Sequence, residues 1–246
     1  MTVLRTVLFA LATVTAVSPA VAQDQPETGT RLAAPASRGI TGVSLTSRDQ
    51  AAGAKRMAEC IYNRKGVLAR QALLAPNAQS ATAALDRLMG EVRCFGDDAS
   101  NDLVGMRIAL IPRDILRGML AEAAMNRNKD DVATLQPLPI QQIYQRNWFA
   151  ITGRHVSVDE MGACIADTNP AGIIALTRTG PMSKEEGAAF ASLGGNMHDC
   201  LRAGTKLQAS RQALRAALAD ALYQRLNAPA PAPTATTATA VEAAKN

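Results

Sequence analysis

The sequence predicts an all-α protein made of two tandem helical repeats that pack together, each closed by its own disulfide. Three observations support this prediction. Apolar residues recur at three- and four-residue spacing, which is typical of amphipathic helices. The layout of the stretch Met57–Met125 recurs in the stretch Met161–Tyr223. The four cysteines fall at corresponding places of these two stretches.

The repeat also selects a disulfide pairing. An even number of cysteines in an exported chain indicates disulfides, and four cysteines permit three pairings. If both units fold alike, each unit closes its own bond, and each bond stabilises the fold by about 3–4 kcal/mol by constraining the unfolded chain. Free thiols are the alternative. The predicted bonds are Cys60–Cys94 and Cys164–Cys200, and the runs Leu116–Met125 and Leu214–Tyr223 correspond as well.

Both ends of the chain differ in composition from its middle. Arg5, the apolar run Val7–Val17 and the small residues Ala20 and Ala22 form the pattern of a cleaved export signal, and the apolar run is too short to span a bilayer. We therefore expect a periplasmic or secreted protein with no transmembrane segment in the mature chain. The expected divisions are a signal peptide at 1–22, a flexible lead at 23–46, helical repeat 1 at 47–130, a connector at 131–156, helical repeat 2 at 157–227 and a disordered Ala/Pro/Thr tail at 228–246.

Capping patterns predict where several helices begin. In a capping box, a Ser side chain accepts a hydrogen bond from the backbone N–H three residues later. The Glu or Gln at that later position accepts a hydrogen bond from the backbone N–H of the Ser. Asn before Pro is another start signal, because Asn caps the helix and Pro lacks an N–H that would otherwise be unsatisfied. The predicted starts are Ser47 with Gln50, Pro112, Ser157 with Glu160, Asn169 with Pro170, and Ser183 with Glu186.

Glycine and proline predict helix ends. Gly66 interrupts the first helix, Pro76 stops the next, and the pair Gly194–Gly195 is expected to break the helix that begins at Ser183. Helices are further expected over about 67–75, 80–94, 112–125 and 211–226. Alternating residues over 103–111 have β character, and 205–209 takes the equivalent place in repeat 2, so the two can pair as a small two-stranded ribbon.

The connector carries three of the eight aromatic residues, at Tyr144, Trp148 and Phe149. We expect these rings to fill the seam between the two repeats, because one large side chain buries much apolar area. A surface on which a ligand stacks is the alternative interpretation.

The charge and composition of the chain bear only weakly on the class of its partner. The formal charge is +5, and removal of a signal that carries only Arg5 leaves +4, a mild bias toward anionic partners. Aromatic residues make up 3% of the chain, which leaves few stacking platforms and disfavours single-stranded nucleic acid as a partner.

Four arginines form a duplicated basic pattern on two equivalent helices. A stripe of this kind can hold an anionic envelope component such as a lipid head group. We favour instead a solvated outer face with local ion pairs to Asp114, Glu122 and Asp220. The arginines are Arg113, Arg117, Arg211 and Arg215.

No catalytic or metal-binding pattern predicts an activity or a cofactor. The two histidines, His155 and His198, exclude a three-histidine site, and a metal at His198 would need Cys200 as a free thiolate. The sequence contains no G-x-S-x-G elbow, phosphate-binding glycine loop, H-E-x-x-H or C-x-x-C. Paired carboxylates lie at predicted turns or helix starts, where acids are expected for solvation. These pairs are Asp97–Asp98, Asp130–Asp131 and Glu185–Glu186.

The run Cys200–Leu207 and the run Leu214–Tyr223 resemble a segment of uncharacterised exported helical-repeat proteins of proteobacteria. The resemblance covers both units, and departs in the first, where about eight extra residues follow Cys94. It implies export and a repeated helical plan, and no activity. We therefore expect a non-enzymatic binding or scaffold protein of the cell envelope that contacts an envelope protein or an anionic envelope component. A carrier of a small apolar or metal ligand is the alternative.

Overall fold

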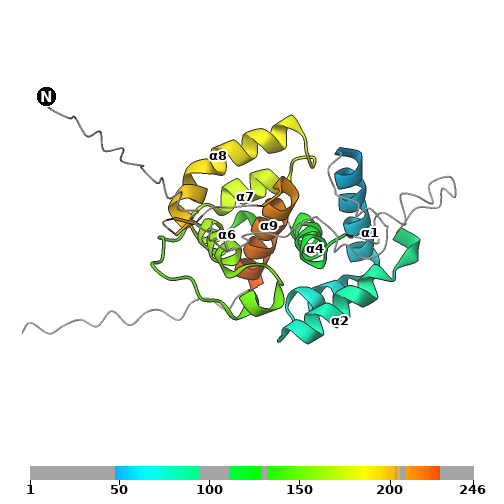
Figure 1. Ribbon diagram of the computed structural model, residues 1–246. Helices are drawn as coiled ribbons and strands as arrows, with labels where there is room; N and C mark the ends of the chain where they lie inside the picture. Colours follow the sequence, from blue (N-terminus) through cyan, green and yellow to red (C-terminus); the bar gives the residue numbers. More distant parts are fainter. Residues whose placement is uncertain (1–47, 95–110, 129–131, 203, 206–208, 228–246) are drawn as a thin grey trace, which may run out of the picture.

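The computed structural model describes residues 48–94, 111–128, 132–202, 204–205 and 209–227, and within these ranges the chain is helical and contains no strand (Figure 1). The predicted all-α class is confirmed. Among the described helices, none is long and apolar enough to cross a membrane. The predicted signal, lead, tail, Ser47 cap and two acidic pairs, at 97–98 and 130–131, lie outside these ranges, as does most of the ribbon at 103–111 and 205–209.

The names repeat 1 and repeat 2 are kept here for the two predicted stretches, 47–130 and 157–227. The helices of repeat 1 form nearly as its helix signals predict. The first helix continues through Gly66 where two helices were expected, although its backbone leaves helical geometry at the preceding Lys65 (φ −130°, ψ 34°). The third expected helix begins under an Asn77 cap and ends early, so that Cys94 lies in a short 3₁₀ turn. The elements are α1 (Arg48–Leu73), α2 (Ala78–Met89), η1 (Val92–Cys94) and α4 (Arg113–Arg127).

Repeat 2 confirms two of its three predicted caps. The Asn169 side chain accepts a hydrogen bond from Gly172 N at 2.9 Å, and Ser183 Oγ accepts one from Glu186 N at 3.0 Å. The Ser157 cap is wrong, because His155 Nδ1 accepts the bond from Ser157 N at 3.3 Å and the helix begins two residues earlier than Ser157 would place it. The elements are α6 (Val156–Thr168), α7 (Pro170–Thr177), α8 (Lys184–Cys200) and α9 (Arg211–Asn227).

The expected break at Gly194–Gly195 is also wrong. Helix α8 runs through both glycines to Cys200. A glycine inside a helix costs only about 1 kcal/mol, and two contacts offset this cost. Leu193 is fully buried, and Cys200 is bonded to Cys164 of α6.

Both predicted disulfides are confirmed. Cys60 of α1 is bonded to Cys94, and Cys164 of α6 is bonded to Cys200 at the end of α8. The Cα–Cα distance is 5.6 Å in each, within the usual range. Each bond therefore joins two elements of the same repeat.

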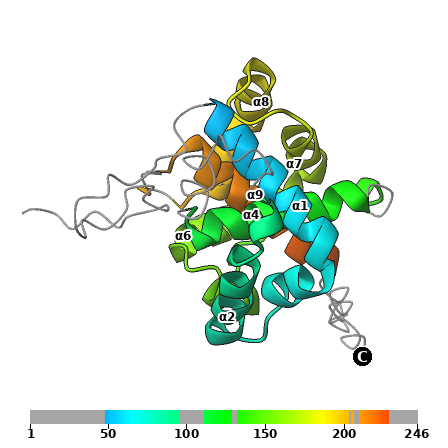
Figure 2. The same ribbon diagram turned by 90° about the vertical axis from the view of Figure 1, so that its right-hand side faces the viewer.

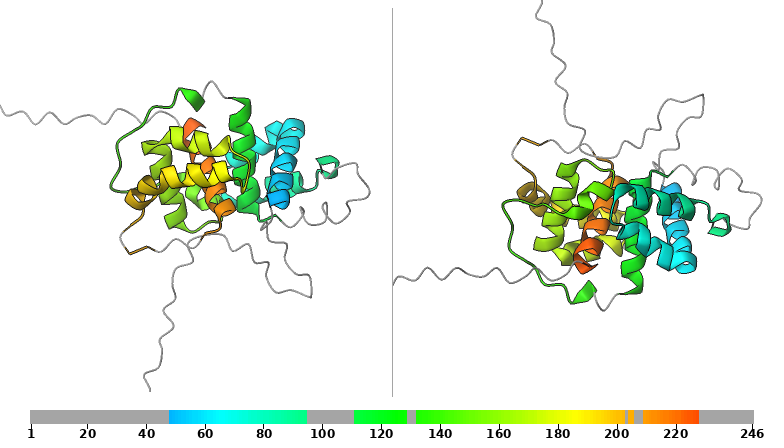
Figure 3. Two further views of the ribbon diagram at one scale, coloured as in Figure 1. Left: turned by 90° about the horizontal axis from the view of Figure 1, so that it is seen from above. Right: turned by 90° about the horizontal axis from the view of Figure 1, so that it is seen from below.

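Helices α6, α9, α4 and α1 lie in a row, with α2 against one side of it and α7 and α8 against the other (Figures 1 and 2). The helices within residues 48–127 and those within residues 156–227 lie side by side, and α4 and α9 meet in the middle (Figure 3). Both central helices are buried over most of their length. At their crossing, a Cβ on Gly118 would lie 2.3 Å from the Cα of Ala216, so only glycine permits this approach. Gly118 and Ala216 hold the same position in the two sequence runs.

Candidate functional site

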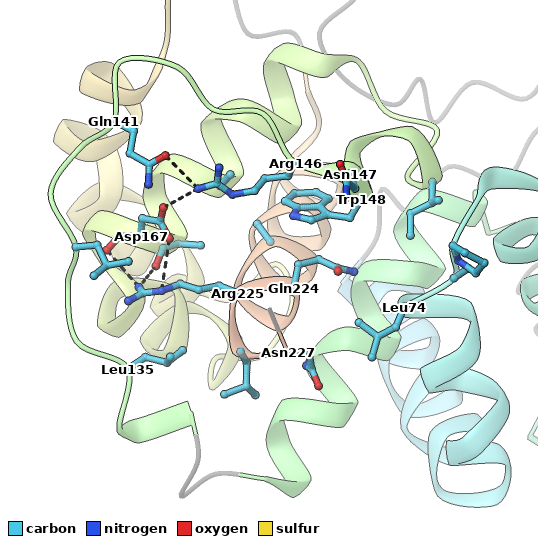
Figure 4. Close-up of a pocket in the computed structure, with 18 residues that line it drawn as sticks. Leu74, Leu135, Gln141, Arg146, Asn147, Trp148, Asp167, Gln224, Arg225 and Asn227 are labelled. Carbon is cyan, nitrogen blue, oxygen red and sulfur yellow. Dashed lines mark hydrogen bonds and ion pairs between the residues drawn. The ribbon is translucent and has the colours of Figure 1, made fainter. Parts of the chain in front are cut away.

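A cleft of about 1040 Å³ lies where the two repeats and the connector meet (Figure 4). The turn after α1 forms one wall, and the connector and α6 form the opposite side, while the last two turns of α9 lie along it. We call it the seam cleft. It combines an apolar part near Leu74 and Trp148 with a polar part around Asp167.

The apolar part of the seam cleft is accessible to solvent. Leu74 is 44% exposed and Leu138 of the connector is 36% exposed, although large aliphatic side chains are usually buried. Trp148 lies in the 3₁₀ turn η3 (Asn147–Ile151), and its half-buried indole meets Phe149 edge to face, with ring centroids 4.6 Å apart. The indole thus forms part of the wall of the cleft.

The polar part of the seam cleft is a set of side chains that fasten the connector to repeat 2. Arg225 of α9 donates to the backbone carbonyls of Gln136, Ala166 and Asp167. Arg146 of the connector donates to Asp167 Oδ2 at 3.3 Å. These cations are therefore occupied by contacts within the protein, and they position the connector along the cleft.

Burial decides the protonation tendencies of this polar part. It raises the pKa of Asp167 above its ordinary value, against the opposing charges of Arg225 and Arg146. It lowers the pKa of Arg225, although Asp167 works in the other direction. The ion pair between Arg225 Nε and Asp167 Oδ1, 3.5 Å apart, opposes both of these effects of burial.

The aromatic residues only partly follow their prediction. Tyr144 is buried against Ala163 and Cys164, and Phe149 packs on the same cluster, so these rings cover the disulfide of repeat 2 and not the seam. Trp148 does reach the seam, because η3 also contacts α2 of repeat 1. The sequence thus identified the aromatic residue of the cleft. Sequence reasoning missed Leu74 and the exposed connector residues. For the connector a signal was present, because the run Pro-Leu-Pro-Ile at 137–140 places apolar side chains next to prolines.

The four arginines do not form a solvated stripe. Arg117 is fully buried and Arg215 nearly so, which contradicts both a solvated face and an anionic-surface contact at these two positions. Arg113 and Arg211 are exposed; Arg113 pairs with Asp86 at 2.7 Å, and Arg211 lies 3.9 Å from Glu186. Arg117 and Arg215 are buried because they lie on the faces along which α4 and α9 pack, unlike Arg113 and Arg211.

The buried arginines pair across the two repeats. Arg117 Nε donates to Asp220 Oδ2 at 2.7 Å, and Arg215 Nη2 donates to Glu122 Oε1 at 2.7 Å. The partners named in the sequence prediction are therefore partly right, but the pairs are not local. In the aligned runs Arg117 matches Arg215 and Glu122 matches Asp220, so the two pairs are reciprocal.

Each buried arginine also holds the C-terminal end of a helix in its own repeat. Arg117 donates to the carbonyls of Ala72 and Leu73, at the end of α1. Arg215 donates to the carbonyl of Thr177, at the end of α7. A cation at a helix C-terminus satisfies free carbonyls and is favoured by the helix dipole.

Further charges complete the two buried groups. Arg154 donates to Asp220 at 2.6 Å and to Asp159 at 2.8 Å. Burial alone would raise the pKa of Asp220, but Arg117 and Arg154 outweigh it and lower that pKa. On the other side, Lys55 donates to Glu122, and Arg215 also donates to Glu186 at 3.0 Å. Glu186 was expected to be solvated at a helix start, and it is instead fully buried.

The charge of Arg154 also acts on Asp114. Burial raises the pKa of Asp114 to about 6, against the attraction of Arg154. Its Oδ2 is buried without a hydrogen bond in the described part of the chain. The aligned position in repeat 2 is Gln212, which carries no charge.

A metal site at His198 would need Cys200 as a free thiolate, and the structure does not provide one. Cys200 is bonded to Cys164, and the His198 side chain is 91% exposed beside Asp199. Over the described ranges, no cluster of three or more His, Cys, Asp or Glu is arranged to hold a metal ion. No protein-family model matches the chain, and no curated protein or solved structure is significantly similar to it.

Proposed function

We propose that this chain is an exported, non-enzymatic binding protein of the cell envelope whose seam cleft takes an apolar segment of a partner protein. The observation that carries the proposal is the exposure of Leu74 and Leu138 on a hollowed surface beside Trp148. Exposed apolar side chains in a concave site with an aromatic anchor are features of recognition surfaces.

The charged groups of the cleft support binding in preference to catalysis. Asp167, Arg146 and Arg225 contact one another or backbone carbonyls, so their role is to hold the connector. A general acid or base must reach the proton that it transfers, and a group held in a structural ion pair is poorly placed to do so.

Two disulfides support a location outside the cytoplasm, because such bonds persist in oxidising compartments. The export pattern at 1–22 adds to this support. These two features support the proposed location in the periplasm or the extracellular medium.

Site-directed photo-crosslinking tests the proposal. A photoreactive side chain at Leu138 should form adducts with one partner in envelope extract, identified by mass spectrometry. A second substitution in the same chain, Leu74→Glu, adds a charge to the cleft. It should abolish these adducts, because an unpaired carboxylate on an apolar contact is costly to desolvate. Val67→Glu is the matched control, since Val67 is 76% exposed on α1 and does not line the cleft. Adducts that survive Leu74→Glu would contradict the proposal.

The cleft volume favours a small apolar ligand as a second candidate. Ligand pockets measure roughly 300–1,000 Å³, and the seam cleft, at about 1040 Å³, lies just above this range. Native mass spectrometry of protein purified from the envelope separates the candidates. A carrier should retain a small apolar molecule that Leu138→Glu releases, whereas a protein-binding module should show the bare chain mass.

A further inference from the structure

A second hollow, of about 390 Å³, lies between the end of α1 and helix α2. It shares Leu74, Ala75 and Pro76 with the seam cleft, so the two hollows lie on either side of the same turn. We call it the α1–α2 groove. A ligand that fills both hollows has to be long and flexible enough to pass over this turn. The other residues that line the groove are Leu68, Gln71, Ser80, Ala83, Ala84 and Arg87.

The α1–α2 groove is apolar except for a few polar groups, of which Arg87 is the charged one. Between Arg64 and Cys94 the chain carries five basic and two acidic residues. Both acids are engaged elsewhere, because Asp86 pairs with Arg113 and Glu91 pairs with two cations of α1. Arg87 is exposed and has no ion pair among the described residues. The groove therefore favours a ligand with a negative charge.

The seam cleft supplies apolar surface and no comparable free cation. Its arginines, Arg146 and Arg225, already contact Asp167 and backbone carbonyls. An anionic group placed there would also lie near Asp167, a like charge. Leu138 and Trp148 add apolar surface to the same cleft. The charges thus favour a ligand whose anionic end lies at Arg87 and whose apolar end lies in the seam cleft.

We propose that the α1–α2 groove and the seam cleft together bind an unbranched fatty acid, with its carboxylate on Arg87 and its alkyl chain passing over Leu74 into the seam cleft. The planar guanidinium of an arginine matches the geometry of a carboxylate, and each CH₂ group removed from water adds to the affinity. A single free cation matches one negative charge, which favours a carboxylate over a dianionic phosphate. This inference rests on the second candidate function, because it names the ligand class of the carrier.

Calorimetric titration of the mature, delipidated protein with dodecanoate and with dodecan-1-ol tests the role of Arg87. The protein should bind dodecanoate about fivefold more tightly than the alcohol, a factor typical of an exposed ion pair. Arg87→Gln should bind the two alike, and high salt should also reduce the preference. Arg56→Gln is the matched control, since Arg56 is an exposed arginine of α1 that lines neither hollow. Far-UV circular dichroism checks that each variant is folded.

Absence of dodecanoate binding overturns the inference. An unchanged preference for dodecanoate in Arg87→Gln does so as well, because the carboxylate would then lie elsewhere.

The orientation of the ligand is tested with Trp148, the only tryptophan of the chain. Bromine quenches indole fluorescence on contact, so two brominated forms of dodecanoate are compared at saturation. The form with bromine on its last carbon should quench Trp148 strongly, because the alkyl end lies in the seam cleft. The form with bromine next to the carboxylate should quench it at least twofold less. Equal quenching, or the reverse order, overturns the proposed orientation and with it the role of Arg87.

The outcomes are separable from those of the proposed functions. If native mass spectrometry shows a retained small apolar molecule that Leu138→Glu releases, and dodecanoate does not bind, the carrier function stands and the fatty acid is wrong. If dodecanoate binds with the expected dependence on Arg87 and protein from the envelope shows the bare chain mass, the fatty-acid site stands and the carrier function is wrong. The Leu138 adducts test the partner protein independently of both.

Discussion

The two buried charge groups on either side of the α4–α9 crossing have the same plan and different compositions. Around Arg117, two cations face Asp220 and Asp159, and Asp114 adds a carboxylate nearby. Around Arg215, the second cation is Lys55, the acids are Glu122 and Glu186, and the position matching Asp114 is the neutral Gln212. The first group therefore carries an acidic excess that the second lacks.

This comparison separates the contacts that the two sides share from those in which they differ. The reciprocal arginine–acid pairs and the arginine contacts with helix ends occur on both sides. Buried pairs of this kind contribute little net stability but are costly to break, so they specify how the two repeats fit together. The flanking charges are free to differ, and they set the response of each side to mutation and pH.

Removal of either buried arginine should have the largest effect. Arg117→Ala and Arg215→Ala should each lower the free energy of unfolding by about 3–5 kcal/mol, because buried acids and helix carbonyls lose their partner. The loss should be larger for Arg215→Ala. In Arg117→Ala, Asp220 is still paired with Arg154, whereas in Arg215→Ala the cation that remains near Glu186 is the more distant Arg211.

Urea denaturation of the oxidised mature protein measures both losses. Arg113→Ala is the control, because the exposed pair of Arg113 with Asp86 should contribute less than about 1 kcal/mol. Equal losses for Arg117→Ala and Arg215→Ala would show that the flanking charges do not distinguish the two sides.

The crossing itself should tolerate substitution on one helix only. In Gly118→Ala the added methyl group meets the backbone of Ala216, which cannot move aside, so the free energy of unfolding should fall by about 2–3 kcal/mol. Ala216→Gly at the matching position should cost only about 1 kcal/mol, the difference in helix propensity. Thermal unfolding of the two variants checks the asymmetry, and a stable Gly118→Ala protein would mean that the helices cross elsewhere.

Local patterns predicted the features that local physics determines. The caps at Asn169 and Ser183 and the α4 and α9 boundaries are set by neighbouring residues, and the disulfides followed from the repeat. Burial of Arg117 and Arg215 depends on acids about a hundred positions away, which helical spacing does not encode. A signal was nevertheless present, because α4 and α9 are apolar on all sides apart from a few charges, as helices buried all round are.

The seam cleft was less predictable for a related reason. Its walls come from the turn after α1, the connector and the end of α9, and no spacing within one helix brings these together. Trp148 was identified as a seam residue because large aromatic side chains are rarely left without a packing partner. The exposure of Leu138 depends on the path of the connector, which Arg225 fixes through backbone carbonyls.

The acidic excess near Arg117 should make stability fall as pH rises. Because the pKa of Asp114 is raised from 3.8 to about 6, the folded state binds more protons than the unfolded state between these values. Stability from this group is therefore complete below about pH 4 and is lost as pH rises to about 6. Asp114→Asn should remove this dependence and raise the free energy of unfolding at pH 7 by about 2 kcal/mol, at 1.36 kcal/mol per pKa unit with allowance for altered contacts.

Urea denaturation at pH values from 4 to 7 measures the dependence. Asp86→Asn is the matched control, because Asp86 is exposed and its removal leaves the Arg117 group unchanged. Gln212→Glu tests the comparison from the other side, because a carboxylate introduced at this buried position should make stability fall as pH rises. If Asp114→Asn leaves the pH profile unchanged, Asp114 is not the group that distinguishes the two sides.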